Sequence, residues 1–236
     1  MLKLPIYLDN NATTQMDPRV FDAMKPYFLE IYGNAASKSH AFGWAAEEAV
    51  DYARGQVASL IGASEKEIIF TSGATESNNL SLLGLMEHGV RTNRKHIVST
   101  EIEHSAVLEP LRLLSEAGFE ITRIRPEASG AVSFSRILSA VRSDTLAVSV
   151  MQINNETGIR QPIKEIASGL TDEEVVFHVD VCCGGVGVWT WTRTRTRTRT
   201  RRHGCPVCTC EFADRNSGQY TCLFCGTIVS AYLLDT

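Results

Sequence analysis

Four polar clusters in this 236-residue chain hold side chains that could carry out chemistry. They are residues 72–76, which include Gly73, and the surroundings of His104, Asn155 and Asp180. A glycine turn that opens a helix attracts phosphate, and an imidazole can stack on a ring or move protons. An amide can hydrogen-bond a ring substituent, and a partly buried carboxylate requires a cationic or hydrogen-bonding partner. Together these groups predict a site for a phosphorylated, ring-containing ligand.

Each cluster also has a purely structural interpretation. Residues 72–75 could form an ordinary capped helix start, and His104 could be a capping or half-buried histidine. Asn155 lies in a sequence typical of a turn, and Asp180 could cap a helix after a strand. Taken one at a time, these alternatives stay open, and only the arrangement of the four clusters favours a ligand site.

The clusters follow strands at regular intervals, which indicates an α/β fold. Strand-like runs at 67–70, 96–99, 146–151 and 175–179 each lead directly into one cluster, and 119–124 adds a fifth run. Helical periodicity occupies the intervals, and Gly62 and Gly118 are suited to end two of the helices. Alternating strands and helices predict a mostly parallel sheet covered on both faces, with ligands bound beyond the carboxyl ends of its strands. The four clusters should therefore converge.

Composition divides the chain near residue 180. Residues 1–180 carry 16 Lys and Arg against 24 Asp and Glu, whereas residues 181–236 carry 7 against 3. All seven cysteines lie in the last 55 residues, and Lys164 is the last lysine. We expect a domain over 1–180, a low-complexity segment over 181–202 and a Cys-rich tail over 203–236. No apolar run is long enough to cross a membrane and no secretory segment begins the chain, so we expect a cytoplasmic protein.

The motifs in the first 180 residues resemble the cysteine desulfurases of the class V aminotransferase superfamily, in that family's order and spacing. They occupy residues 7–14, 33–37, 70–79, 103–107, 154–158 and 178–180. The resemblance implies a truncated large domain of the aspartate aminotransferase fold (fold type I) that binds pyridoxal 5'-phosphate (PLP). It also implies a homodimer that converts L-cysteine to L-alanine and enzyme-bound sulfur for iron–sulfur cluster assembly, with a sulfur-acceptor or scaffold protein as partner.

The same resemblance implies a role for individual residues. Ala74, Thr75 and Glu76 match the family's phosphate-binding turn. His104 matches a catalytic histidine that stacks on the PLP ring and acts as acid and base. Asn155 matches the contact to the ring oxygen, and Asp180 matches the partner of the pyridine nitrogen.

The chain departs from the family pattern after Asp180. Cys183 stands where the family has a cofactor-contacting glutamine, and Pro206 stands where a Ser-Gly-His-Lys motif supplies the lysine that holds PLP. Lys164 precedes Asp180 and is not expected to substitute. The family's sulfur-accepting loop cysteine also has no counterpart in this sequence. Because the chemistry requires that lysine, we expect this chain to be inactive as written.

The segment after Asp180 reads as Gly and Val, then Trp and Thr, then Thr alternating with Arg up to Arg202. Tryptophan and arginine codons can differ by one base, so a drifting DNA repeat fits this pattern and favours a frameshift or a misjoined exon. The arginines lack aromatic or base-reading companions, so no nucleic acid is expected as a partner. A fold-type-I sheet also needs later strands, and a chain that stopped near 180 would leave a strand edge exposed.

Four tail cysteines form the pattern C-x2-C-x13-C-x2-C, which suits a tetrahedral zinc site. They are Cys205, Cys208, Cys222 and Cys225, with Cys210 as an extra cysteine. Out-of-frame translation also yields cysteines by chance. The alternative function is therefore a non-catalytic, degenerate PLP-fold scaffold with a zinc-binding tail.

Overall fold

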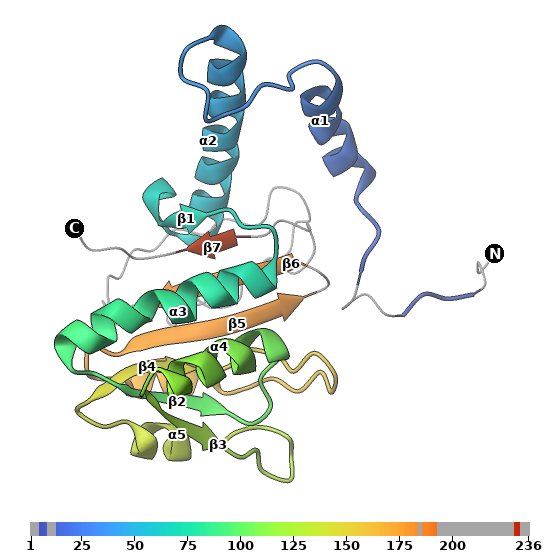
Figure 1. Ribbon diagram of the computed structural model, residues 1–236. Helices are drawn as coiled ribbons and strands as arrows, with labels where there is room; N and C mark the ends of the chain where they lie inside the picture. Colours follow the sequence, from blue (N-terminus) through green and yellow to red (C-terminus); the bar gives the residue numbers. More distant parts are fainter. Residues whose placement is uncertain (1–4, 9–12, 184–185, 193–228, 232–236) are drawn as a thin grey trace.

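The computed structural model describes residues 5–8, 13–183, 186–192 and 229–231 (Figure 1). Within them, one sheet has the strand order β1-β7-β6-β5-β4-β2-β3. The strands are β1 (Ile68–Ile69), β2 (His96–Thr100), β3 (Glu120–Ile124), β4 (Thr145–Ser149), β5 (Val176–Cys183), β6 (Val186–Thr192) and β7 (Val229–Ala231). All five predicted strands are present.

The sheet is parallel where four of the predicted strands lie. β3, β2, β4 and β5 pair in parallel, whereas β6 runs antiparallel to β5 and β1 runs antiparallel to β7. The strand β1 lies at the opposite edge from β3, separated from β5 by β7 and β6. The predicted mostly parallel α/β sheet is confirmed.

The helices are α1 (Pro18–Leu29), α2 (Ala41–Ile61), α3 (Ala74–Thr92), α4 (Ser105–Glu116), α5 (Phe134–Ala140) and α6 (Ile163–Gly169), with a short 3-10 turn, η1 (Glu65–Glu67), after α2. The carboxylate of Asp17 accepts a hydrogen bond from the Arg19 N–H at 2.8 Å and so caps α1. Gly62 (φ 72°) ends α2 in the left-handed region, and Gly118 (φ 89°) follows α4. Both predicted helix stops are confirmed.

Helices cover both faces of the parallel strands, as the sequence predicts. On one face, Leu82 of α3 and Leu111 of α4 pack with Ile97 of β2. On the other face, Ile137 of α5 and Ile166 of α6 pack with a second set of strand residues that includes Val98, the next residue along β2. Neighbouring strand residues point to opposite faces, so both layers of core come from the same strands.

The sheet continues past residue 180. β5 pairs along its length with β6, from Phe177 opposite Thr192 to Cys183 opposite Val186. In the described residues β5 is therefore not an edge strand, because part of the predicted low-complexity segment pairs with it. The expectation that Asp180 ends its strand, and the alternative that it caps a helix, are both wrong because β5 runs on to Cys183.

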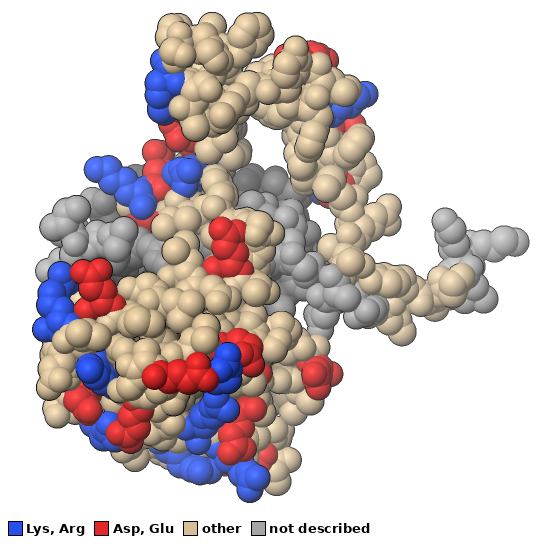
Figure 2. All heavy atoms as spheres, viewed as in Figure 1, with Lys and Arg blue, Asp and Glu red and all other residues tan. Residues whose placement is uncertain are grey.

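The N-terminal helix α1 and the first half of α2 form an arm that stands away from the sheet (Figure 1). No residue of α1 is buried, and Phe28 keeps 69% of its surface exposed. Figure 2 shows mostly uncharged surface over this arm, whereas charged side chains gather lower on the molecule. Among the described helices, none combines the length and the apolar character required to cross a membrane.

Candidate functional site

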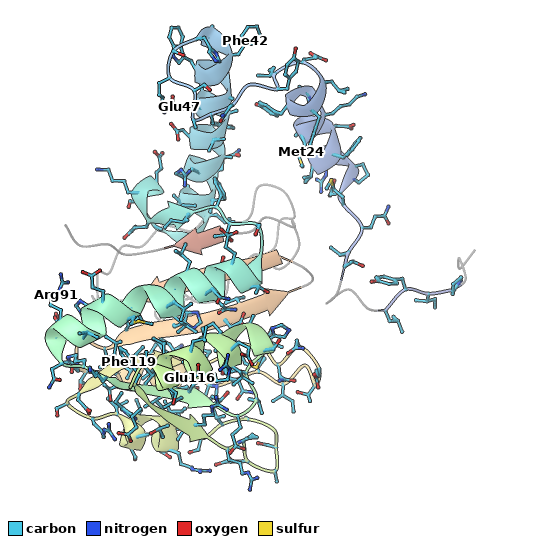
Figure 3. All side chains as sticks on the ribbon, in the orientation of Figure 1. Met24, Phe42, Glu47, Arg91, Glu116 and Phe119 are labelled. Atoms are coloured by element: carbon cyan, nitrogen blue, oxygen red, sulfur yellow. The ribbon has the colours of Figure 1, made fainter. Side chains whose placement is uncertain are left out.

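The predicted clusters lie at one rim of the parallel sheet. In Figure 1 the arrowheads of β2 and β5 point to the side on which α3 begins. Figure 3 labels Arg91 at the other end of α3, far from that rim. The strand β1 lies at the opposite edge of the sheet, and the loop after it leads to the start of α3, whose first turns place Asn78 beside Asp180 of β5 (Figure 1).

Asp180 lies on β5 and is buried, with 1% of its surface exposed. Its neighbours Val179 and Val181 pack on the face that α5 and α6 cover, so Asp180 faces α3. Its Oδ1 atom has no hydrogen-bond partner in the part of the chain that the structure describes. Burial raises the pKa of Asp180 to about 7, and the nearby Asn78 amide limits the rise. Such a carboxylate would be stabilised by a cationic ligand.

Asn78 belongs to α3 and is fully buried beside Asp180. Neither its Nδ2 nor its Oδ1 atom meets full hydrogen-bond geometry with a described residue, although the amide is close enough to Asp180 to lower the pKa of that carboxyl. A buried amide without partners is costly unless a ligand or a rearranged neighbour satisfies it. Asn78 and Asp180 together therefore form a buried polar pair between α3 and β5.

The turn before α3 is held by a side chain that reaches back to it. Oε2 of Glu76 accepts hydrogen bonds from the backbone N–H of Ser72 at 2.6 Å and from its hydroxyl at 2.5 Å. These two bonds lower the pKa of the Glu76 carboxyl. Gly73 offers no side chain to cap the helix, so the first N–H groups, from Ala74 onward, have no partner within it. The Glu76–Ser72 bonds hold the turn and still leave the backbone N–H groups of Ala74 and Thr75 without partners inside the helix.

His104 is half-buried and precedes α4. Its Nδ1 atom accepts a hydrogen bond from the backbone N–H of Ala106 at 3.1 Å, so the predicted capping role is confirmed. Because Nδ1 accepts, the proton of the neutral ring lies on Nε2. Capping orients the ring and leaves Nε2 as the nitrogen for any other contact.

Asn155 is half-buried in a turn whose hydrogen bonds come from its neighbour. The Oδ1 atom of Asn154 accepts from the N–H groups of Glu156 at 3.1 Å and Thr157 at 2.9 Å. The Nδ2 atom of Asn154 donates to the Ile102 carbonyl at 3.1 Å. The turn chemistry predicted for this segment is therefore present, and it belongs to Asn154.

Three residues that join the clusters were not predicted as site residues: Asn78, Glu103 and Asn154. Asn78 lies one turn after Ala74, Glu103 precedes His104 and Asn154 precedes Asn155. The sequence could have indicated them only by their position, because each is a polar residue within or beside a predicted motif.

Neither a lysine nor a metal site joins this rim in the described residues. Lys164 lies on α6, whose buried residues Ile163 and Ile166 pack on the face opposite α3. No group of three or more His, Cys, Asp or Glu side chains that could hold a metal occurs in the described ranges. The predicted zinc ligands Cys205, Cys208, Cys222 and Cys225 lie outside those ranges, as does Pro206.

The family model for aminotransferase class-V matches residues 6–186. The chain belongs to this family. It is 54% identical over 179 residues to "Cysteine desulfurase IscS" of Anaeromyxobacter sp. (strain K), covering 76% of this chain and 44% of that protein. It is 48% identical over 176 residues to the Homo sapiens "Cysteine desulfurase", covering 75% of this chain and 38% of that one. The predicted resemblance is confirmed.

Solved structures of class V relatives show the same fold. A "NIFS-LIKE PROTEIN" matches with a TM-score of 0.70 at 38% identity, covering 75% of this chain and 48% of that chain. DndA from Streptomyces lividans matches with a TM-score of 0.66 at 46% identity, covering 75% of this chain and 49% of that one. The chain thus spans less than half the length of each relative named here.

Proposed function

We propose that this chain is the cofactor-binding part of a PLP-dependent cysteine desulfurase whose substrate is L-cysteine. The observation that supports it most is Asp180, a buried carboxylate with an unpartnered oxygen on the sheet face where α3 begins. The protonated ring nitrogen of PLP is a cation of the kind that such a carboxylate requires.

The groups around Asp180 fit the rest of the cofactor. The backbone N–H groups of Ala74, Thr75 and Glu76 form the positive end of a 19-residue helix, which favours a phosphate. The Thr75 side chain is exposed and can add a hydroxyl donor. The Glu76 carboxylate is engaged with Ser72, so its backbone rather than its side chain would meet the phosphate.

When bound, PLP supplies an electron sink for bonds at the substrate's α-carbon. Asp180 would keep the ring nitrogen protonated, and Asn155 would hydrogen-bond the ring oxygen. His104 would lie against the ring with its Nε2–H free to donate, since Ala106 occupies Nδ1. These residues bind and orient the cofactor without the lysine.

Turnover is not expected of this chain. The position that matches the family's lysine is Pro206, and Lys164 is on the wrong face of the sheet. Sulfur supply for iron–sulfur cluster assembly, a sulfur-acceptor or scaffold partner and a cytoplasmic location are proposed on the family resemblance. They concern the intact enzyme.

A homodimer is proposed on the same ground, and the arm supports it. Phe21, Tyr27, Phe28 and Leu29 of α1 are all exposed. An apolar surface of this kind is typical of protein interfaces, and a second copy would cover it. Light scattering after size-exclusion chromatography of the full chain should give twice the mass of 26.0 kDa, and Phe28→Ser should shift it toward the monomer.

Cofactor binding can be tested without turnover. The full chain should bind PLP reversibly in equilibrium dialysis, and Asp180→Ala should weaken binding about tenfold or more because the ring cation loses its counter-charge. Asp172→Asn, which removes a carboxylate paired with Arg94 well away from the site, serves as the control. Equal affinity for wild type and Asp180→Ala would refute the proposed site.

A second candidate is the non-catalytic scaffold with a zinc-binding tail. The tail spacing of Cys205, Cys208, Cys222 and Cys225 and the Pro206 replacement favour it. Metal analysis of purified protein should find one zinc per chain in this case, lost on Cys205→Ser with Cys222→Ser. Alanine release from L-cysteine at a rate typical of the family would exclude it.

A further inference from the structure

Glu103 holds together the ends of two neighbouring strands. Its side chain is buried, with 5% of the residue exposed. Its Oε1 atom accepts a hydrogen bond from the Thr100 hydroxyl at 2.6 Å and another from the Met151 backbone N–H at 3.0 Å. Thr100 is the last residue of β2, and Met151 follows the end of β4. One oxygen atom thus joins the carboxyl ends of both strands.

A second bond joins the same two loops. Asn154 donates from Nδ2 to the carbonyl of Ile102 at 3.1 Å. Ile102 and Glu103, the bonded residues after β2, directly precede His104. Met151 and Asn154, the bonded residues after β4, precede Asn155. The residues proposed to contact the PLP ring are therefore carried by loops that are tied to each other just before them.

Burial determines the charge of Glu103. Its Oε2 atom is buried and has no hydrogen-bond partner in the described parts of the chain. Burial raises the pKa of Glu103 to about 8, and the negative charge of Asp180 contributes to the rise. Burial thus favours the neutral acid, and in that form the Oε1 atom can still accept both bonds.

We propose that Glu103 is a positioning residue that places His104 and Asn155 by tying the loops after β2 and β4 together. Its relevance to the cofactor rests on the proposed function, but the tie itself can be measured in the protein without PLP. A neutral acceptor of the same shape should replace Glu103, because the tie needs an oxygen lone pair and not a charge.

Two substitutions of Glu103 distinguish the effect of its hydrogen-bond acceptor from the effect of its charge. Glu103→Gln keeps an oxygen acceptor and is always neutral, whereas Glu103→Leu keeps similar bulk and loses the acceptor. Thr100→Val removes one of the two donors and tests the tie if Glu103→Leu does not fold. Glu101→Gln and Glu101→Leu are matched controls, because Glu101 is exposed in the same loop and pairs only with Arg125 among the described residues.

The first measurement uses the full chain without PLP. Amide hydrogen exchange at Met151 should rise about tenfold in Glu103→Leu, and the imidazole NMR signals of His104 should shift. Glu103→Gln should restore both, Thr100→Val should shift the His104 signals in part, and the Glu101 variants should change neither. Unchanged Met151 exchange and His104 signals in Glu103→Leu and Thr100→Val would overturn the proposal, as would failure of Glu103→Gln to restore them.

The second measurement is PLP affinity by equilibrium dialysis. Glu103→Leu should bind PLP about tenfold more weakly, with Glu103→Gln close to wild type. If wild type does not bind PLP, the proposed function fails, while the exchange and NMR results still decide the role of Glu103. If wild type binds and Glu103→Leu binds equally well, the positioning role is refuted.

Discussion

The Nδ1 atom of His178 lies 2.8 Å from the Oγ atom of Ser149, and the two residues face each other in register across β5 and β4. His178 is fully buried, and burial lowers its pKa to about 3. Burial also lowers the pKa of His96, whose ring lies between the hydroxyls of Thr145 and Thr122, each at 2.8 Å. Burial therefore disfavours the charged form of both imidazoles in the folded chain.

These histidines predict acid destabilisation. Below their ordinary pKa of 6.5 the unfolded chain takes up protons that the folded chain refuses, so the free energy of unfolding should fall as pH drops. Urea unfolding at intervals from pH 7 to pH 4 measures this slope. It is best measured in Glu103→Gln with Asp180→Asn, where two opposing carboxyls are removed. A flat profile in that double variant would contradict the neutral, buried assignment.

Buried carboxyls predict the opposite slope. Glu103 binds its proton more tightly when folded, with a pKa raised from 4.5 to about 8, and the pKa of Asp180 is raised from 3.8 to about 7. The folded chain thus holds more protons than the unfolded chain between these values, and their contribution to stability is lost as pH rises from about 4 to 8. Glu103→Gln should be more stable than wild type at pH 8 and lose that advantage by pH 5. Glu101→Gln should show no such difference.

Gly89 and Gly84, both in α3, should respond oppositely to alanine. A Cβ at Gly89 would lie 2.7 Å from the Arg94 carbonyl oxygen and 2.8 Å from a methyl group of Leu146, whereas one at Gly84 would meet nothing within 4 Å. Gly89→Ala should therefore lower the free energy of unfolding by about 1–3 kcal/mol. Gly84→Ala should raise it by about 0.5–1 kcal/mol through helix propensity. Urea unfolding curves measure both, and an equal response would contradict the packing described.

Core packing under α4 predicts a second matched pair. Leu111 is fully buried against β2 and α3, whereas Leu113 on the same helix keeps 39% of its surface exposed. Leu111→Ala should cost about 2–5 kcal/mol of unfolding free energy, and Leu113→Ala about 1 kcal/mol or less. Thermal unfolding of the two variants beside wild type provides the comparison. A larger loss at Leu113 would mean that α4 presents another face to the sheet.

Much of the rim could be predicted because its signals are local. The strand before His104 has the β-branched residues Ile97 and Val98 at its centre, and Gly62 and Gly118 mark helix ends by their backbone freedom. Asp180 was predicted to be partly buried and is in fact almost fully buried, and its place inside a strand was missed. The strand continues through Cys183 because the next segment, β6, folds back and pairs with it, starting from Cys183 opposite Val186. That segment was interpreted as low-complexity from its sequence, so this strand pair was not predicted.

The sequence by itself determined the family motifs and the alternation of strands and helices. Only the tertiary structure decided that Asn78 lies beside Asp180 and that Glu103 joins the ends of β2 and β4. The Glu103–Met151 bond spans 48 positions along the chain. Such contacts depend on strand register and helix placement, which arise from packing of the whole sheet and leave no periodic pattern in the sequence.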